Sequence, residues 1–288
     1  MNVLDIRNLT LSFKLYSGVV PALHGISLCV ARGERVALVG ESGSGKSVTA
    51  RIILGLLQEH RNAKITGEVL FQGKDIARLS RKARHALRGT AMSMIFQDPT
   101  SSLNPVFPIA RQFHDVLLRA APGLSFEDAR ARAAASLEEV AIDDSARVLD
   151  AYPFQLSGGM NQRVMIAMAL ANQPALLLAD EPGTALDVTV QAQTLDLMRR
   201  LVIDHKTAVL FISHNLGVVR EFADRIYVIY RGRIVEAGPT AAVFRRPRHA
   251  YTRALMAAQP RITGGGVPEI LDRSDAFLEP AEIHGEAS

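Results

Sequence analysis

At 288 residues, with 48% hydrophobic and 22% charged residues, the chain has the composition of a folded globular protein of one large domain or two lobes. It has no apolar run of about 18 residues and no basic start followed by an apolar segment, so we expect neither a membrane-spanning helix nor a secretory signal. Its single cysteine, Cys29, excludes an internal disulfide or a metal cluster built from cysteines, and it favours a reducing cytoplasmic setting.

The charge balance is only slightly basic. Thirty-three Lys and Arg residues against 29 Asp and Glu residues give a formal net charge of +4. Several of the cations gather in one stretch, at Arg78, Arg81, Lys82, Arg84 and Arg88. Such a stretch can meet nucleic acid or anionic lipid, but the excess is small. We therefore interpret it as a solvated helix face and expect no nucleic-acid partner.

Residues 1–32 predict antiparallel strands, because apolar and polar side chains alternate with a period of two. The first run ends near Phe13, and a loop with Gly18 and Pro21 precedes a second run from Ala22 to Val30. An aromatic ring at such a strand end can stack on an adenine base or pack in the core. Both interpretations of Phe13 stay open on these residues alone.

The stretch Gly40-Glu41-Ser42-Gly43-Ser44-Gly45-Lys46-Ser47 is the centre of the sequence. It fits the pattern G-x-x-x-x-G-K-[ST], follows an apolar strand over 35–39 and precedes a helix predicted over 48–57. The glycines let backbone N–H groups wrap a triphosphate, and the helix start points its dipole at the phosphates. Lys46 would neutralise the β- and γ-phosphates, and the Ser47 hydroxyl would hold Mg²⁺. The alternative, a chance glycine-rich turn, is disfavoured by this context.

The middle of the chain predicts strands that give way to helices. The expected elements are, in chain order, a strand over 67–71, a turn over 72–75, a helix over 76–88, a strand over 92–96 that ends at Gln97, and a loop over 98–105. Residues 110–149 then have helical periodicity with an interruption at Pro122-Gly123. This segment indicates a helical insertion.

The segment Leu156-Ser157-Gly158-Gly159-Met160 leads into a helix predicted over 161–172. Ser157 and the two glycines leave backbone donors at that helix start, which makes it a second place suited to an anion. Ser-Gly-Gly is also a common helix start, so a purely structural role is the alternative.

Two further apolar strands end in polar side chains. The strand over 175–179 runs into Asp180, Glu181 and Pro182. The strand over 207–213 follows an amphipathic helix over 188–204 and delivers His214. Short strands over 226–230 and 233–236 come next, and the tail from 261 lacks periodicity, so we expect little structure there.

Strands that alternate with helices predict an α/β fold with a mainly parallel sheet, which binds ligands beyond the carboxyl ends of its strands. The phosphate loop, Gln97, Glu181 and His214 would therefore converge on one sheet edge. There Asp180 would bind Mg²⁺ with Ser47 and Gln97, and Glu181 would orient and deprotonate an attacking water. His214 would hydrogen-bond the γ-phosphate. Taken singly, His214 is a partly buried histidine and Gln97 a loop amide; their shared position favours a function.

In order and spacing, these motifs resemble the ATP-binding subunit of an ABC transporter over about residues 1–260. They are Gly40–Ser47, Gln97, Leu156–Gln162, Leu176–Glu181, Ala185–Asp187 and His214. Leu-Ser-Gly-Gly discriminates best, because many unrelated P-loop proteins share the other motifs. Phe96–Pro99 with Ser102–Pro105, and Arg246–Thr252, resemble the peptide and nickel importer branch. Leu-Ser-Gly-Gly-Met resembles the first of its two ATPases.

The resemblance implies a P-loop NTPase (RecA-like) α/β core with a parallel sheet, an antiparallel β subdomain and an inserted helical subdomain. The core would take residues 1–97 and 166–240, the helical signature subdomain 98–165, and a partly unstructured C-terminal extension 241–288. By similarity Phe13 would stack on adenine. The expected ATP-binding residues are Phe13, Gly40, Glu41, Ser42, Gly43, Ser44, Gly45, Lys46, Ser47 and Val48.

The resemblance further implies two ATPase subunits, sibling chains or two copies, that clamp two ATP molecules head to tail. Each ATP would lie between one phosphate loop and the other subunit's Ser157, Gly158, Gly159 and Gln162, with Asp187 at the dimer seam. The helical subdomain would dock on two membrane permease subunits served by a periplasmic solute-binding protein. The chain would then lie peripherally on the cytoplasmic face of the inner membrane and drive import of di- or oligopeptides.

Three positions depart from the family pattern: Gly183 in place of Thr or Ser, Asn215 after His214 in place of Asp, and Asn161 in place of a basic residue. Nickel or another solute of the same branch is one alternative. A soluble ABC ATPase that acts on nucleic acid would have coiled-coil insertions or tandem cassettes, and a P-loop kinase would lack the segment 156–159. The sequence fits neither of these two classes.

Overall fold

The computed structural model describes residues 1–98, 102–183, 188–258 and 282–283. The chain forms two compact units, one of Met1–Arg78 with Leu210–Ser288 and one of Leu79–Val209. Among the described residues, no helix combines the length and the apolar character that crossing a bilayer requires.

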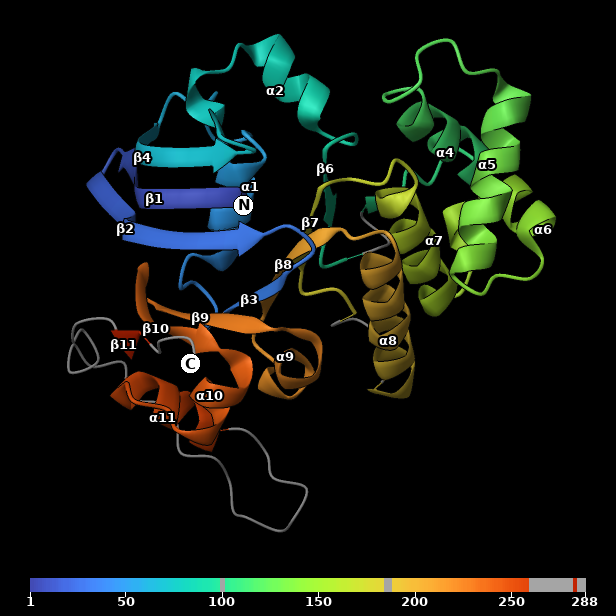
Figure 1. Ribbon diagram of the computed structural model, residues 1–288. Helices are drawn as coiled ribbons and strands as arrows, with labels where there is room; N and C mark the ends of the chain where they lie inside the picture. The colour runs from blue at the N-terminus through green and yellow to red at the C-terminus, as the bar shows by residue number, and fades with distance from the viewer. Residues whose placement is uncertain (99–101, 184–187, 259–281, 284–288) are drawn as a thin grey trace. The chain divides into compact units, whose positions relative to one another are not determined.

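The first unit contains an antiparallel sheet with strand order β2-β1-β4-β5, of which Figure 1 labels β2, β1 and β4. Its strands are β1 (Asn2–Leu15), β2 (Gly18–Ala31), β4 (Ala63–Phe71) and β5 (Lys74–Asp75). The predicted period of two is confirmed. Leu4 and Ile6 are buried, and after a shift in register the alternation resumes with Leu9 and Leu11, which are also buried. The predicted loop with Gly18 and Pro21 is wrong, since both residues belong to β2. Proline is accommodated there because β2 is an edge strand.

A second group of strands in this unit has the order β11-β10-β9-β3-β8. These strands are β3 (Arg35–Val39), β8 (Ala208–Ser213, in this unit from Leu210), β9 (Arg225–Tyr230), β10 (Arg233–Pro239) and β11 (Glu282–Ile283). β3 runs parallel to β9, and β9 forms an antiparallel hairpin with β10. Residues 36–39 of β3 are completely buried, as expected of a strand covered on both faces.

Helix α1 (Lys46–Ile53) follows β3 and is shorter than predicted. Gly55 ends it with a φ of 68°, donating to Ile52 at 2.8 Å, while the N–H of Leu56 donates to Arg51 at 2.9 Å. This is a Schellman motif, which stops a helix at a left-handed glycine. The unit also contains the short helices η1 (Ile76–Arg78), α9 (Leu216–Phe222), α10 (Thr240–Arg245) and α11 (Ala250–Ala257).

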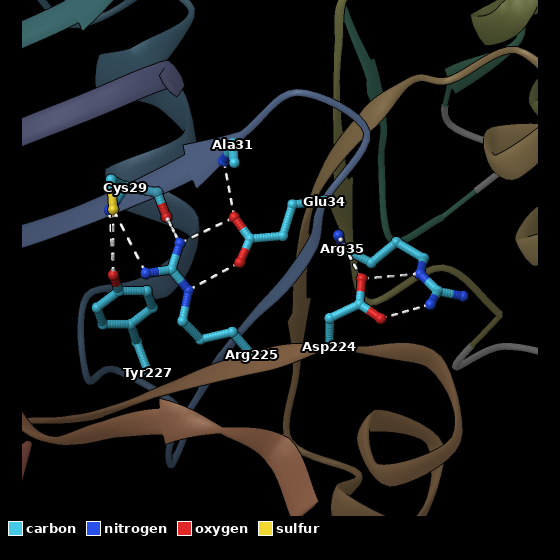
Figure 2. Close-up of polar contacts among 7 residues, drawn as sticks. All are labelled: Cys29, Ala31, Glu34, Arg35, Asp224, Arg225 and Tyr227. Carbon is cyan, nitrogen blue, oxygen red and sulfur yellow. Dashed lines mark hydrogen bonds and ion pairs between the residues drawn. The ribbon is translucent and has the colours of Figure 1, made fainter. Parts of the chain in front are cut away.

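Two ion pairs join residues 34 and 35, where β3 begins, to residues 224 and 225, where β9 begins (Figure 2). Arg225 donates from Nε and Nη2 to the two carboxylate oxygens of Glu34, both at 2.8 Å. Arg35 donates from Nε to Asp224 at 3.1 Å. Burial lowers the pKa of Arg225, but the hydrogen bonds to Glu34 and Cys29 and the charges of Tyr227 and Glu34 together raise this pKa overall. The fork geometry therefore fixes these two segments against each other.

The second unit pairs β6 (Met92–Ile95) in parallel with β7 (Leu176–Asp180). Its helices are α2 (Arg81–Leu87), α4 (Ile109–Leu117), α5 (Phe126–Glu139), α6 (Ser145–Asp150), η2 (Pro153–Gln155), α7 (Gly158–Leu170) and α8 (Val188–Asp204). Helices α4 to α7 lie together (Figure 1), and Phe113, Leu137 and Val148 are buried there. The predicted helical character of residues 110–149, its break near Pro122 and the helix over 188–204 are confirmed.

The basic stretch forms two short helices in place of the predicted one over 76–88. The break comes at Ser80, whose hydroxyl accepts the N–H of Ala83 at 3.2 Å and starts α2. All side chains of α2 are described, and none of them is buried. This exposure is compatible with a solvated helix face, which stays a prediction.

Candidate functional site

The phosphate loop has the predicted strand, loop and helix context, with β3 ending at Val39 and α1 beginning at Lys46. Lys46 is only 5% exposed, and its ammonium donates to the carbonyl oxygens of Gly40 and Glu41, both at 2.8 Å. The N–H of Ser44 also donates to the carbonyl of Glu41, at 3.2 Å. The loop thus curls around the Lys46 side chain, and a buried cation is the chemistry that a phosphate group needs.

The hairpin of β9 and β10 supports this loop from one side. A Cβ at Gly40 would lie 2.1 Å from the carbonyl oxygen of Ile229, so only glycine fits there. The N–H of Gly232 donates to the carbonyl of Ser44 at 2.9 Å. Gly232 itself has a φ of 74°, and a Cβ there would lie 2.4 Å from the carbonyl of Ala22. Glycine is therefore required at position 40 in the phosphate loop and at position 232 in the hairpin.

Phe13 lies in β1, is half-buried, and pairs with Val20 of β2. The same β2 strand reaches the phosphate loop, because a Cβ at Gly45 would meet Leu23 Cδ2 at 2.6 Å. Phe13 is thus on the hairpin that borders the loop. This position is compatible with stacking on a base and does not make Phe13 a core residue.

His214 follows β8 directly, and β8 is the neighbour of β3 in the strand order. The imidazole is exposed rather than partly buried. Asn215, which departs from the family pattern, is the N-cap of α9, and its side-chain oxygen accepts the N–H of Gly217 at 3.0 Å and of Val218 at 3.3 Å. Asparagine caps a helix as well as aspartate does, which explains why the departure is tolerated.

The second unit brings Gln97 and Glu181 together. Gln97 follows β6 and Glu181 follows β7, and the Gln97 amide donates to Glu181 Oε2 at 3.1 Å. Asp180 is the last residue of β7. Glu181 has a φ of 49°, in the left-handed region that residues with a Cβ rarely adopt. Strain of this kind at a strand end is typical of a functional position.

The helix start at Ser157 forms as predicted. Ser157 is the N-cap of α7 and accepts the N–H of Met160 at 3.2 Å, while Ser157 and Gly158 are exposed. Gln162, which was predicted to meet the ATP of another subunit, is 0% exposed in this structure, and that role stays a prediction. Gln162 lies on the inner face of α7, one turn beyond the helix start.

Asn161 has a structural role that the sequence did not reveal. It is 3% exposed, and its amide donates to the carbonyl of Pro153 at 2.9 Å and of Leu156 at 3.4 Å. This side chain fixes the turn that carries Ser157 to the helix start. The family pattern has a basic residue at this position, so it does not predict a buried amide there.

The residues of the predicted site are divided between the two units. Phe13, the phosphate loop and His214 belong to the first unit, and Gln97, Asp180, Glu181 and residues 157–159 belong to the second. Asp187, predicted at a dimer seam, lies outside the described residues. A strand, a glycine loop and a buried lysine at a helix start define a P-loop nucleotide-binding protein.

Comparison with known proteins places the chain within this class. Residues 23–184 match the family described as ABC transporter, and residues 235–277 match the C-terminal region of oligopeptide/dipeptide transporters. The chain belongs to the ABC transporter ATP-binding family, in its oligopeptide/dipeptide branch. It is an ATP-hydrolysing subunit of such a transporter.

Individual relatives agree with this assignment. The oligopeptide transport ATP-binding protein OppD of Bacillus subtilis is 46% identical over 268 residues, which cover 93% of this chain and 75% of OppD. The probable D,D-dipeptide transport ATP-binding protein DdpD of Escherichia coli is 47% identical over 269 residues, covering 93% and 81%. The dimeric post-hydrolysis structure of the ATP-binding cassette MJ0796 with ADP and Pi is similar with a TM-score of 0.72 and 30% identity, covering 82% and 98%.

Proposed function

We propose that the chain drives the import of di- or oligopeptides by binding ATP at its phosphate loop and hydrolysing it at Glu181. The observation that carries the proposal is the loop itself, in which Gly40 and Glu41 curl around the buried ammonium of Lys46. The N-terminus of α1 begins at that lysine, so backbone donors and a fixed cation are available to one anion. The adenine would stack on Phe13, at the hairpin that borders the loop.

Hydrolysis would use the pair of Gln97 and Glu181. The oxygen of a water attacks the γ-phosphorus, the bond to the β,γ-bridging oxygen breaks, and the Glu181 carboxylate takes the proton of the water. The hydrogen bond from Gln97 would orient this carboxylate. His214, exposed at the end of β8, would donate to the γ-phosphate. Products are ADP and inorganic phosphate.

Magnesium fits the donor set of the proposed site. Ser47, Asp180 and Gln97 offer hydroxyl, carboxylate and amide oxygens, which are the hard ligands that Mg²⁺ prefers. Among the described residues no group of three His, Cys, Asp or Glu side chains could hold a metal alone. This agrees with an ion that shares its coordination with nucleotide phosphates. Bound there, Mg²⁺ would neutralise charge on the phosphates.

A second subunit would complete the site. The exposed start of α7 offers backbone donors and the Ser157 hydroxyl, and it would face the ATP held by the phosphate loop of a sibling chain or a second copy. The relative MJ0796 is dimeric with ADP and Pi, which supports this arrangement. Asp187 would lie at the seam between the subunits.

The helical part of the second unit would dock on two permease subunits at the cytoplasmic face of the membrane, with a periplasmic solute-binding protein on the other side. Exposed apolar side chains support this proposal, and they are Val106, Phe107, Phe126, Tyr152 and Phe154. The loop that carries Phe107 lies beside Tyr152, because the N–H of Ile109 donates to Ala151 at 3.0 Å. Residues 98–165 would form this helical subdomain, 1–97 with 166–240 the nucleotide-binding core, and 241–288 the C-terminal extension.

Phosphate release by the purified chain tests the proposal. We expect release from ATP only when Mg²⁺ is added, with no stimulation by DNA or RNA. Reconstituted with its permease and binding protein, the chain should drive dipeptide uptake that stops with Glu181→Gln. Release that requires nucleic acid, or uptake of nickel instead of peptide, would contradict the proposal.

A further inference from the structure

Tyr251 joins the C-terminal segment to the phosphate loop. It lies in the segment 246–252, which the chemistry proposed above does not use. Its side chain is 0% exposed, and its hydroxyl accepts the N–H of Glu41 at 3.0 Å. Its ring lies 4.3 Å, between centroids, from the ring of Tyr230 at the end of β9. This hydrogen bond thus joins two residues that are 210 positions apart in the chain, and one of them belongs to the loop that would hold ATP.

A buried support holds Tyr251 in place. Glu236 of β10 is 0% exposed, and its carboxylate accepts the N–H of Arg248 at 2.9 Å and of His249 at 3.1 Å. His249 is 1% exposed and is the N-cap of α11, accepting the N–H of Tyr251 at 3.1 Å through Nδ1. Burying a carboxylate is costly unless it is hydrogen-bonded, so this arrangement is specific rather than incidental.

The contact fixes the residue on which the loop turns. The N–H of Glu41 is held by Tyr251, while its carbonyl accepts both the ammonium of Lys46 and the N–H of Ser44. The first peptide group of Glu41 is therefore oriented from outside the loop and the second from within it. Loss of the Tyr251 hydroxyl would let the first of them rotate, and the ordering of the loop would then have to be supplied by ATP.

We propose that Tyr251 is a positioning residue for the phosphate loop, through which the C-terminal segment sets the affinity for ATP. This inference rests on the proposed nucleotide site. The residue acts through Glu41 and Lys46 and takes no part in bond breaking. Burial raises the pKa of Tyr251, so its hydroxyl keeps its proton throughout the neutral range in which ATP binds.

The test compares Tyr251→Phe with Tyr227→Phe. Tyr227 is also a buried tyrosine of the first unit, and its hydroxyl accepts the N–H of Cys29 in β2 at 3.2 Å (Figure 2). We expect Tyr251→Phe to raise the Kd and KM for ATP about fivefold, the usual effect of one lost hydrogen bond, with kcat unchanged. Tyr227→Phe should leave both constants at the wild-type value.

Two further measurements distinguish a failure of the inference on Tyr251 from a failure of the proposed nucleotide site. Amide hydrogen exchange without nucleotide should quicken at residues 40–47 in Tyr251→Phe and not in Tyr227→Phe. Lys46→Ala reports on the nucleotide site itself. If Lys46→Ala weakens ATP binding while Tyr251→Phe matches wild type in Kd and exchange, the inference on Tyr251 is overturned and the site stands. Unchanged binding in Lys46→Ala would overturn the site.

Discussion

The side-chain amide of Gln97 lies 3.1 Å from a carboxylate oxygen of Glu181, and the two residues follow the paired strands β6 and β7. Glu181 keeps a left-handed backbone there, with a φ of 49°. The amide donor fixes Oε2 of this carboxylate at the strand end. A carboxylate held in this way would be oriented before water arrives, which the proposed general base catalysis requires.

Glu181→Gln should retain ATP binding and abolish turnover, because the amide keeps the shape of the side chain and cannot accept the proton of water. Without hydrolysis, ATP should also trap a dimer, which size-exclusion chromatography would detect. Glu139→Gln, which changes an exposed glutamate of α5 beside His205, is the matched control and should hydrolyse normally. Wild-type turnover in Glu181→Gln would remove Glu181 from the mechanism.

Lys46→Ala should weaken ATP binding by more than about tenfold, since it removes the buried cation that the loop encloses and that opposes the phosphate charge. Calorimetric titration with ATP measures this. Lys74→Ala, at an exposed lysine of β5 in the same unit, is the control and should bind as wild type. Equal affinities of the two variants would argue against the phosphate-loop interpretation.

Ser157→Ala should lower stability by about 1 kcal/mol, the usual cost of losing a helix N-cap. It should also reduce turnover, because the same hydroxyl would meet the ATP of a second subunit. Ser125→Ala is the comparison, since Ser125 caps α5 by accepting the N–H of Asp128 at 3.0 Å, although its hydroxyl also donates to the Asp128 carboxylate at 2.7 Å. Thermal unfolding should show similar losses for both variants, and phosphate release should fall only in Ser157→Ala.

Gly40→Ala should unfold at lower temperature and bind ATP poorly. Its new methyl group would lie 2.1 Å from the carbonyl oxygen of Ile229, and a backbone atom cannot move aside as a flexible side chain can. Overpacking of this kind costs about 1–3 kcal/mol. At Gly73 a Cβ would meet nothing within 4 Å, so Gly73→Ala should lose only what its φ of 78° costs. Denaturant titration of both variants would measure the difference.

Stability should fall at alkaline pH through Tyr227. Burial raises the pKa of Tyr227 from its usual 10.0 to about 12. The folded state therefore holds this proton after the unfolded chain has released it, and the contribution to stability is complete below pH 10 and lost as the pH rises towards 12. Tyr227→Phe should flatten this part of the pH profile of the free energy of unfolding. An unchanged slope would show that other groups control alkaline unfolding.

The strands and the glycine loop that carry the site residues were predicted from the sequence better than the side-chain contacts around them. The glycine pattern 40–47 and the apolar strands before Gln97, Glu181 and His214 carry local signals, and the structure shows those strands. The buried Gln162, the buried amide of Asn161 and the contact of Tyr251 with Glu41 depend on side chains that meet only after folding. Periodicity and motif spacing contain no information on such pairs. The strand from Gly18 was missed because Pro21 normally signals a loop.

The two ion pairs at the start of β3 and β9 help to fix the register between these strands. This register also sets which residues meet at the opposite ends of the strands. Glu34 and Arg35 bind Arg225 and Asp224, and a shift by one position would bring charges of the same sign together. One position corresponds to about 3.3 Å of strand. That displacement would separate Gly40 from Ile229 and Glu41 from Tyr251, so ion pairs at one end of β3 help to hold the phosphate loop in position at the other end.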